Sequence, residues 1–323
     1  MRIAVTGSIA TDHLLTFPGR FTDQLLADRL DTVSLSFLAD RMDVRRGGVA
    51  ANIAFGLARL GLAPVLVGAA GVDFADYQLW LKEHGVDVDF VRISDTLHTA
   101  RFVCTTDRDQ NQIATFYAGA MAEAREIDLA AAGTFDLVVV APDDPAAMLR
   151  HTGHCRRTGT PFAADPSQQL ARLDRDAVRE LVDGARFLFT NAYEAALLTE
   201  RSGWSEEEVL ERVGTWVTTL GAEGVVIRRA GQPALTVAAV PAKEVADPTG
   251  VGDGFRAGFL AGLARNWPDE RAAQLGCALA TTVLESVGTQ EYPLSGDALL
   301  TRIAGAYGPD AAREVGPALA GVA

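Results

Sequence analysis

The 323-residue chain is acidic, with 42 Asp and Glu residues against 29 Lys and Arg residues and a formal net charge of -13 at pH 7. Nucleic-acid binding requires a basic patch, so this balance argues against a nucleic-acid partner. The three cysteines, Cys104, Cys155 and Cys277, are too few and too scattered for a disulfide framework. Because the sequence also lacks a signal-peptide core and any apolar run of membrane-spanning length, we expect a soluble, cytoplasmic protein without membrane association.

Short apolar segments rich in β-branched residues recur along the chain and predict buried strands. Segments with helical periodicity lie between them, and the pattern from about 252 to 306 is almost entirely helical. Buried strands that alternate with helices predict an α/β fold with a mostly parallel sheet covered on both faces. The expected strands are 2–7, 63–71, 135–142, 160–166, 185–191 and 215–221, and the expected helices are 48–60, 73–84, 145–157, 174–183 and 192–200.

Two segments, about 12–45 and 88–121, interrupt this alternation. Within the second, residues 99–119 form two alternating runs joined by the polar sequence DRDQN, which predicts a hairpin. An isolated two-stranded ribbon is only marginally stable, so we expect the hairpin to pair with the early segment or with a second subunit. The chain is therefore predicted to form one domain, 1–323, with a small β-sheet lid inserted in it. The exposed edge of such a sheet predicts a homodimer through the lid strands.

The sequence DPTGVGDGF, residues 247–255, places Gly250, Gly252 and Gly254 around a single acid, Asp253. One interpretation is a turn followed by a helix that Asp253 caps. A dinucleotide-binding loop is a poor alternative, because that fingerprint follows a strand directly and opens the first βαβ unit. The motifs of P-loop proteins and of protein kinases are absent from the sequence.

A third interpretation of this stretch is phosphoryl transfer. The backbone N–H groups of Gly250, Val251 and Gly252 at a helix start would form an anion site, strengthened by the helix dipole. A carboxylate inside that site would repel a phosphate, unless it accepts a proton from a hydroxyl while the amides stabilise the transferring group. The stretch therefore predicts phosphoryl transfer to an alcohol.

Three other segments carry weaker signals of the same kind. In RGGVAANIAFGLARLG, residues 46–61, Asn52 follows a glycine pair and is either a solvent-facing or capping amide or a ligand for sugar hydroxyls. NAYE, residues 191–194, follows a strand at the end where α/β proteins bind ligands, and it is either a capping box or a metal or phosphate site. TTLGAEG, residues 218–224, is a further glycine turn after a strand.

In their order and spacing, these segments resemble the ribokinase-like (PfkB) family of sugar and nucleoside kinases, over essentially the whole chain. RGGVAANIAFGLARLG is similar to the family's first signature and DPTGVGDGFRAGF to its second. The resemblance implies a three-layer α/β/α domain with a β-sheet lid. Val251 departs from the small residue that most members carry, and Gly254 from their alanine.

The resemblance also implies roles for individual residues. Asp253 would be the general base, and Gly250, Val251 and Gly252 the anion hole. Asn191 and Glu194 match a motif that places Mg²⁺ and phosphate, with Glu194 acting through water, while Thr219, Gly221 and Gly224 match the turn that lines the ATP site. A monovalent cation such as K⁺ often lies beside the anion hole in this family, and the residues that would line it are Asp247, Thr249 and Ser286.

Within the family, the chain looks most like the bacterial adenosine kinases of actinobacterial type, judged by segments such as VTGSIATDHL, TARFVCTTD and AADPSQQLARL. That resemblance implies a ribose site made by Ser8, Asp12, Gly48 and Asn52, and a purine site made by Ser36, Phe102, Phe116, Gln168 and Gln169. The alternative for Phe102 and Phe116 is an ordinary hydrophobic position on the hairpin.

The expected function is an ATP-dependent adenosine kinase that phosphorylates the 5′-hydroxyl of adenosine to give AMP. Two alternatives remain. One is a sugar kinase of the ribokinase or fructokinase kind, which would not need an aromatic stack. The other is a non-catalytic nucleoside-binding protein on the same fold.

Overall fold

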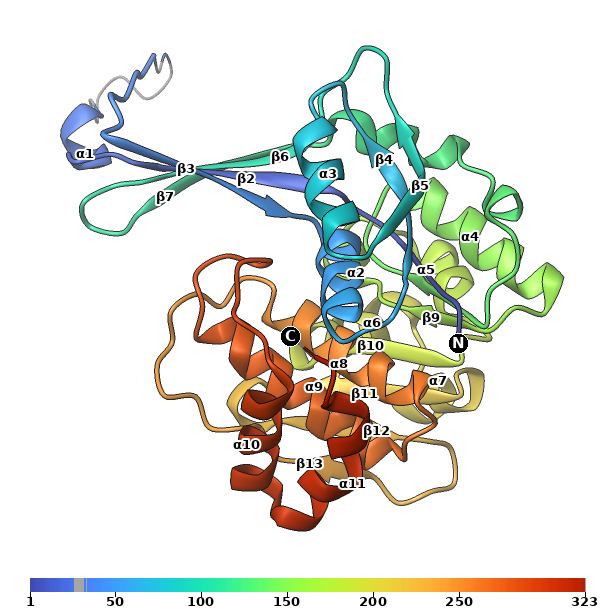
Figure 1. The fold of residues 1–323 in the computed structure, drawn as a ribbon. Coiled ribbons are helices and arrows are strands. Elements are labelled where there is room, and N and C mark those ends of the chain that lie inside the picture. Colours follow the sequence, from blue (N-terminus) through green and yellow to red (C-terminus); the bar gives the residue numbers. More distant parts are fainter. Residues whose placement is uncertain (26–31, 33, 323) are drawn as a thin grey trace.

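The structure is a computed structural model that describes residues 1–25, 32 and 34–322, and within these residues the chain forms one nine-stranded and one four-stranded β-sheet (Figure 1). The nine-stranded sheet, called here the large sheet, has the strand order β13-β12-β11-β10-β9-β8-β1-β4-β5. Its neighbouring strands are parallel except for the β11–β12 and β12–β13 pairs. The strands are β1 (Ile3–Thr6), β4 (Val65–Ala70), β5 (Asp87–Ile93), β8 (Leu137–Val140), β9 (Phe162–Ala164), β10 (Phe187–Asn191), β11 (Thr215–Thr219), β12 (Val225–Arg228) and β13 (Leu235–Val237).

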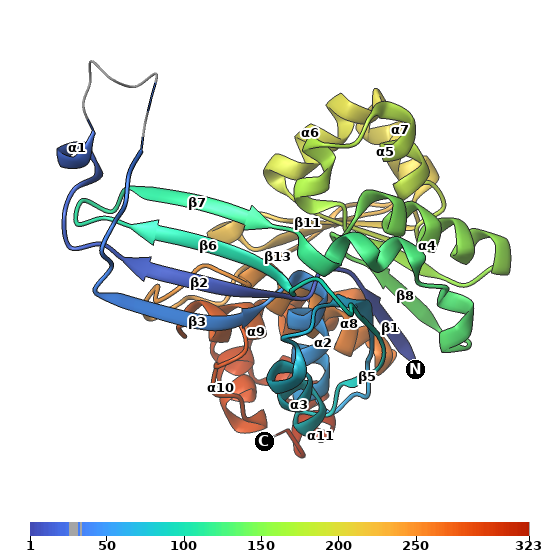
Figure 2. The same ribbon diagram turned by 90° about the horizontal axis from the view of Figure 1, so that it is seen from above.

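Helices cover both faces of the large sheet, because its strands are apolar on both sides. On β8, Leu137 and Val139 belong to one hydrophobic cluster and Val138 and Val140 to the other. The first cluster includes α2 (Val49–Arg59), α3 (Ala75–Glu83), α8 (Val251–Ala264), α9 (Asp269–Leu284), α10 (Gly296–Tyr307) and α11 (Pro309–Leu319). The second includes α4 (Pro145–Thr158), α5 (Arg175–Val182), α6 (Ala192–Ser202) and α7 (Glu206–Arg212). The predicted α/β fold with a helix layer on each face is confirmed, and Figure 2 shows the two layers from above.

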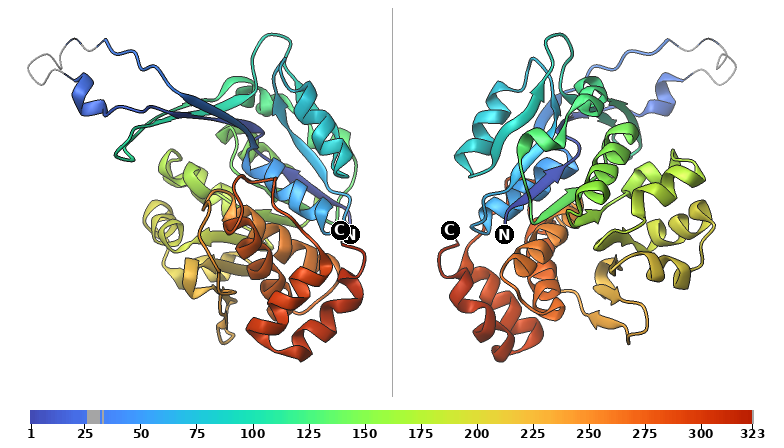
Figure 3. Two further views of the ribbon diagram at one scale, coloured as in Figure 1. Left: turned by 60° about the vertical axis from the view of Figure 1, so that its left-hand side comes forward. Right: turned by 90° about the vertical axis from the view of Figure 1, so that its right-hand side faces the viewer.

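The four-stranded sheet, called here the small sheet, stands away from the large one (Figures 1 and 3). Its order is β3-β2-β6-β7, from β2 (Ala10–Thr16), β3 (Arg41–Gly47), β6 (Ala100–Thr106) and β7 (Gln112–Tyr117). The β6–β7 hairpin is antiparallel, and β6 pairs in parallel with β2. The structure thus confirms both the predicted hairpin and its pairing with the early segment. The short helix α1 (Phe21–Gln24) follows β2.

Three features of the sequence prediction differ from the structure or fall outside it. Residues 88–93 do not belong to the small sheet, because they lie in β5, which pairs with β4 at the edge of the large sheet. Strands β12 and β13 had no counterpart in the prediction. Residues 26–31 and 33 of the early segment lie outside the described residues. Among the residues that are described, no helix is long and apolar enough to cross a membrane.

Candidate active site

A cavity of about 730 Å³ lies where the carboxyl ends of the large-sheet strands meet the small sheet. Ser8 follows β1, Pro142 follows β8, Asp165 follows β9, Asn191 ends β10 and Thr219 ends β11. The small sheet contributes Asp12, Phe102 and Phe116. This is the edge of an α/β sheet at which ligands bind, so the fold itself brings the candidate residues together.

The start of helix α8 enters this cavity. Gly250 is the N-cap, with φ of 75°, and a Cβ there would lie 2.9 Å from Thr289 Cγ2, so this position favours glycine in both conformation and space. Val251 is the first helical residue and Asp253 the third, and the interpretation of Asp253 as the cap is therefore wrong. The backbone N–H groups of a helix's first turn lack helical partners, so those of residues 250–252 are suited to bind an anion.

The Asp253 side chain lies in a buried electrostatic cluster. Its Oδ2 accepts a hydrogen bond of 2.9 Å from Asn52 Nδ2, which links α8 to α2 inside the cavity. Burial raises the pKa of Asp253 to about 6, while the charge of Arg256 and the hydrogen bond from Asn52 act to lower it. A carboxyl with such a pKa is deprotonated at neutral pH and still basic enough to accept a proton.

Two charged residues beside Asp253 were not predicted from the sequence. Arg256 lies one turn further along α8, and its Nε and Nη2 each lie 2.6 Å from a carboxylate oxygen of buried Asp165. Although burial acts to lower it, the pKa of Arg256 is raised by Asp165 and Asp253, so the guanidinium stays charged. An Arg inside an otherwise apolar helix and an Asp directly after a buried strand were the available signals.

The start of helix α2 forms the adjoining wall, next to the start of α8. Gly48 is its N-cap, with φ of 94°, and a Cβ there would lie 2.6 Å from the Ser8 carbonyl oxygen. The Ser8 hydroxyl accepts a hydrogen bond of 3.0 Å from Val49 N, at the first helical position. Asn52 is 7% exposed, which excludes the solvent-facing interpretation of its amide.

Asp12 faces the same wall from β2 of the small sheet. Burial raises the pKa of Asp12 to about 6, Asp247 raises it further and Arg45 opposes both. No described residue donates a hydrogen bond to the Asp12 carboxylate, so its oxygens are available to hydroxyl donors of a ligand.

The aromatic and amide residues assigned to a base site divide between cavity and surface. Phe102 and Phe116 are cross-strand neighbours on β6 and β7, and both line the cavity, with Phe116 half exposed. Gln168 and Gln169 line it as well, and the buried Gln169 Oε1 has no partner among the described residues. Ser36 does not reach the cavity. It is exposed, and its neighbour Phe37 packs against Phe17 and Phe21 beside α1.

Asn191 and Glu194 form a capping box at the start of α6. Asn191 Oδ1 accepts from Glu194 N, and Glu194 Oε2 accepts from Asn191 N, each at 2.8 Å. Both residues also line the cavity, so capping and ligand binding are compatible here. No cluster of three metal-ligating side chains exists among the described residues. The Glu194 carboxylate at the cavity wall instead suits a Mg²⁺ ion that keeps waters and shares its coordination with phosphates.

A second cavity of about 580 Å³ adjoins the first, since Thr219, Gly221 and Gly252 line both. Its other walls are largely apolar and include Gly224, Val240, Val251, Phe255 and Leu284. Thr219, Gly221 and Gly224, assigned from the sequence to the ATP site, therefore lie together between the strand end of β11 and the start of α8.

The residues assigned to a monovalent cation lie on two adjacent segments, since Asp247 N donates to the Leu284 carbonyl oxygen at 3.2 Å, two residues before Ser286. Asp247 accepts hydrogen bonds from the backbone N–H groups of Thr249 at 2.9 Å and Gly288 at 3.1 Å. Ser286 instead donates to the Thr282 carbonyl and lines a separate cavity with Arg302. Asp247 and Thr249 therefore form a turn beside the loop that carries Ser286, while the Ser286 hydroxyl itself points to a helix carbonyl.

Comparison with known proteins relates most of the chain to one family of kinases. The model of the pfkB family of carbohydrate kinases matches residues 9–295. The nucleoside kinase of Burkholderia thailandensis, solved in complex with inosine, superposes with a TM-score of 0.85 at 33% identity and covers 95% of this chain and 99% of its own. The same kinase has been solved with ADP-inosine.

Two curated relatives extend the comparison. The nucleoside kinase of Methanocaldococcus jannaschii is 29% identical over 259 residues, which are 80% of this chain and 85% of that protein. The cytidine kinase of Thermococcus kodakarensis is 26% identical over 282 residues, which are 82% of this chain and 97% of that protein. The first of these relatives is named for nucleosides in general and the second for cytidine.

Proposed function

The chain belongs to the pfkB family of carbohydrate kinases, and on that premise we propose that it is an ATP-dependent nucleoside kinase with adenosine as its preferred acceptor. The observation that carries the proposal is the hydrogen bond between Asn52 Nδ2 and Asp253 Oδ2 inside the cavity. It places a buried carboxylate, a helix start and an amide that can bind sugar hydroxyls around one space. That combination is what transfer of a phosphoryl group to an alcohol requires.

The proposed reaction uses Asp253 as the base. Its carboxylate takes the proton of the nucleoside 5′-hydroxyl as O5′ attacks the γ-phosphorus of ATP. The bond between that phosphorus and the β,γ-bridging oxygen breaks, so the products are a nucleoside 5′-monophosphate and ADP. The N–H groups of residues 250–252 and the positive end of α8 stabilise the charge on the transferring group. Arg256, which faces Asp253 and Asp165, adds a fixed positive charge beside them.

The acceptor is assigned to the side of the cavity beneath the small sheet. Asp12, Gly48 and Asn52 would hold the ribose, with the Asp12 carboxylate accepting from its vicinal hydroxyls. Phe102 and Phe116 offer aromatic faces to a flat base. The unpartnered Gln169 Oε1 offers an acceptor to an exocyclic amino group, which adenosine carries and inosine lacks.

ATP is assigned to the second cavity, with its base against the apolar walls and its phosphates at residues 250–252. Kinases of this family use a divalent metal such as Mg²⁺, and Glu194 would hold it here through water. When bound, the ion would neutralise charge on the phosphates. A monovalent cation such as K⁺ would lie beside Asp247 and Thr249, next to the loop that carries Ser286.

We further propose that the protein works in the cytoplasm as a homodimer. The three cysteines, which are buried and too few for a disulfide framework, suit a reducing compartment. The edge strand β7 of the small sheet is exposed along its whole length and carries Ile113, Phe116 and Tyr117. Exposed edges of this kind favour pairing with another chain. A monomeric mass by light scattering at assay concentration would contradict the dimer.

The decisive experiment is an acceptor panel with Mg-ATP. Adenosine, inosine, guanosine, cytidine, ribose and fructose are offered separately, and ADP release is measured together with the phosphorylated product. We expect the highest kcat/KM with adenosine and little turnover of the free sugars. A preference for ribose or fructose would favour the sugar-kinase alternative, and no acceptor-dependent ADP release would favour a binding protein.

A further inference from the structure

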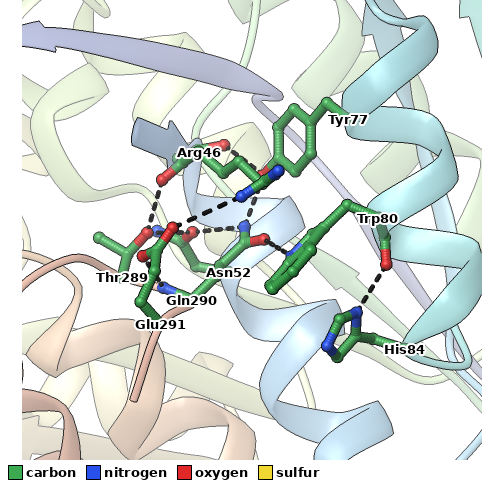
Figure 4. Close-up of polar contacts among 9 residues, drawn as sticks. Arg46, Asn52, Tyr77, Trp80, His84, Thr289, Gln290 and Glu291 are labelled. Atoms are coloured by element: carbon green, nitrogen blue, oxygen red, sulfur yellow. Dashed lines mark hydrogen bonds and ion pairs between the residues drawn. The ribbon is translucent and has the colours of Figure 1, made fainter. Parts of the chain in front are cut away.

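A buried polar cluster contacts Asn52 through its amide oxygen (Figure 4). The cluster joins α2 to Tyr77 and Trp80 of α3 and to Thr289 and Gln290 of the segment that follows α9. Asn52 is 7%, Thr289 4% and Gln290 1% exposed. Buried polar groups are tolerated where their hydrogen bonds are satisfied. In this cluster, each amide can satisfy its bonds with only one assignment of donor and acceptor.

Trp80 fixes the first of these assignments. An indole N–H can only donate, and Trp80 Nε1 lies 3.2 Å from Gln290 Oε1. The Gln290 amide must therefore present its oxygen to Trp80 and its nitrogen to the other side. There, Gln290 Nε2 donates to Asn52 Oδ1 at 3.0 Å and to the Tyr77 hydroxyl oxygen.

Tyr77 enforces the same orientation from a second side. Its hydroxyl donates to the Gly47 carbonyl oxygen at 2.9 Å, and a carbonyl can only accept. With its single proton used, Tyr77 can only accept from Gln290. The Gln290 amide thus has one satisfied orientation, because flipping it would set two donors against each other at Trp80 and two acceptors at Tyr77.

The orientation passes from Gln290 to Asn52. Because Asn52 Oδ1 accepts from Gln290, Asn52 Nδ2 faces Asp253 Oδ2 at 2.9 Å. Thr289 alone cannot impose this, since its one hydroxyl proton has two acceptors at 2.9 Å, Arg46 O and Asn52 Oδ1. A flipped Asn52 would turn its oxygen toward the Asp253 carboxylate and repel it.

We propose that Trp80 and Gln290 are positioning residues for phosphoryl transfer, which hold the Asn52 amide with its nitrogen toward Asp253. The inference rests on the proposed function, because it matters for catalysis only if Asp253 is the base. Neither residue would touch either substrate. Both would act through Asn52, by keeping the base ionised and aimed at the hydroxyl.

The other groups that face Asp253 make Asn52 important. Arg256 of α8 favours the carboxylate, whereas Glu194 of α6 opposes it. Asp165, after β9, is compensated by its own contacts with Arg256, and buried Tyr292 offers no positive charge. Without the Asn52 donor, Arg256 is left as the single group that counters burial and the nearby acids. The pKa of Asp253 should therefore rise.

The test measures kcat at saturating nucleoside and Mg-ATP from pH 5 to 9. Gln290→Met keeps the volume of the side chain and removes the donor to Asn52 Oδ1. The acid limb should then move up by about one pH unit, because the hydrogen bond from Asn52 to the Asp253 carboxylate is worth roughly that much or more. Gln290→Glu should cost more, because its carboxylate still accepts from Trp80 but repels Asn52 Oδ1. Trp80→Phe should shift the limb in the same direction by less.

Tyr77→Phe is the matched control. It removes a buried hydroxyl from the same cluster but leaves the donors from Trp80 to Gln290 to Asn52 in place. We expect it to lower Tm about as much as Gln290→Met does while the acid limb moves much less than in Gln290→Met, because Trp80 still fixes the Gln290 amide. If Gln290→Met lowers Tm but leaves the acid limb at the wild-type pH, the cluster is only structural and the inference is wrong.

A second measurement separates this inference from the proposed function. Carbon NMR follows the ionisation of the Asp253 side chain in the wild-type protein and in Gln290→Met without any turnover. If the wild-type protein phosphorylates no acceptor, the proposed function fails, and the titration still decides the positioning role. A higher pKa of Asp253 in Gln290→Met supports it, and equal values overturn it.

Discussion

Two carboxylates face the cavity from different regions of the fold, and their surroundings differ. Asp253 belongs to the layer of helices packed on the large sheet, whereas Asp12 lies on β2 of the small sheet. Burial raises the pKa of each to about 6. Asp253 is held by an amide donor from Asn52 and by the charge of Arg256, but no described residue donates to Asp12. The protein supplies the partners of one acid and leaves those of the other to a ligand.

The packing of the two regions follows the same division. Helix α8 lies in the larger hydrophobic cluster, and its residues from Asp253 to Gly262 are all buried. On the small sheet, β7 is exposed throughout, and the buried apolar cluster around Ala10, Ala100 and Met121 is small. Residues of the helices packed on the large sheet should therefore control the chemical step. Residues of the small sheet should control the affinity for the acceptor.

The strongest test of this division is Asp253→Asn. The substitution keeps the shape and the contact distance but removes the base, so kcat should fall by about two to four orders of magnitude. Nucleoside affinity, measured by calorimetry, should change little. A kcat close to that of the wild-type protein, with binding intact, would show that Asp253 is not the base.

Phe102→Ala tests the other side of the comparison. Losing an aromatic face from under a base costs about 1–3 kcal/mol, so the KM for adenosine should rise by about 5- to 150-fold. The kcat at saturation should stay within a few-fold of the wild-type value, because β6 contributes nothing to the proposed chemistry. Ile113→Ala, at an exposed position on neighbouring β7, is the control and should leave KM unchanged. Equal effects of the two substitutions would remove the case for a base-stacking site.

The two acids together predict the pH dependence. Both act as carboxylates, so kcat/KM should be full above pH 6 and fall as the pH drops through about 6. With both groups titrating, the limb should approach a hundredfold loss per pH unit well below pH 6. In Asp12→Asn the slope should halve to about tenfold per unit, since Asp253 alone still titrates. An unchanged slope would mean that the ionisation of Asp12 is irrelevant to binding.

The sequence predicted the large sheet better than the small one, for a physical reason. Buried parallel strands such as β8 are apolar on both faces and stand out as continuous runs, whereas β12 and β13 at the sheet edge do not. The position of Asp253 at a helix start followed from its glycines. The interpretation of Asp253 as the N-cap was wrong, because Gly250, with its positive φ, takes that position.

Long-range pairings were invisible in the sequence. Asp165 and Arg256 lie 91 positions apart, and Gln290 lies 238 positions from Asn52. Their contacts depend on how β9, α2 and α8 converge at one edge of the sheet. Ser36 shows the opposite failure, since a residue assigned by resemblance to the base site lies outside the cavity.

The smallest expected effect concerns the cavity proposed for ATP, and it should leave the roles of Asp253 and Asp12 unchanged. Val251 is partly buried and lines the apolar second cavity, whereas its backbone N–H belongs to the proposed anion hole. In Val251→Ala the amide stays and only side-chain contact is lost, at about 1 kcal/mol. The KM for ATP should therefore rise about fivefold while kcat and the KM for adenosine stay constant. Val72→Ala, at an exposed position after β4, is the control. A large loss of kcat in Val251→Ala would instead mean that the valine side chain sets the geometry of the loop, and that the amides of residues 250–252 depend on it.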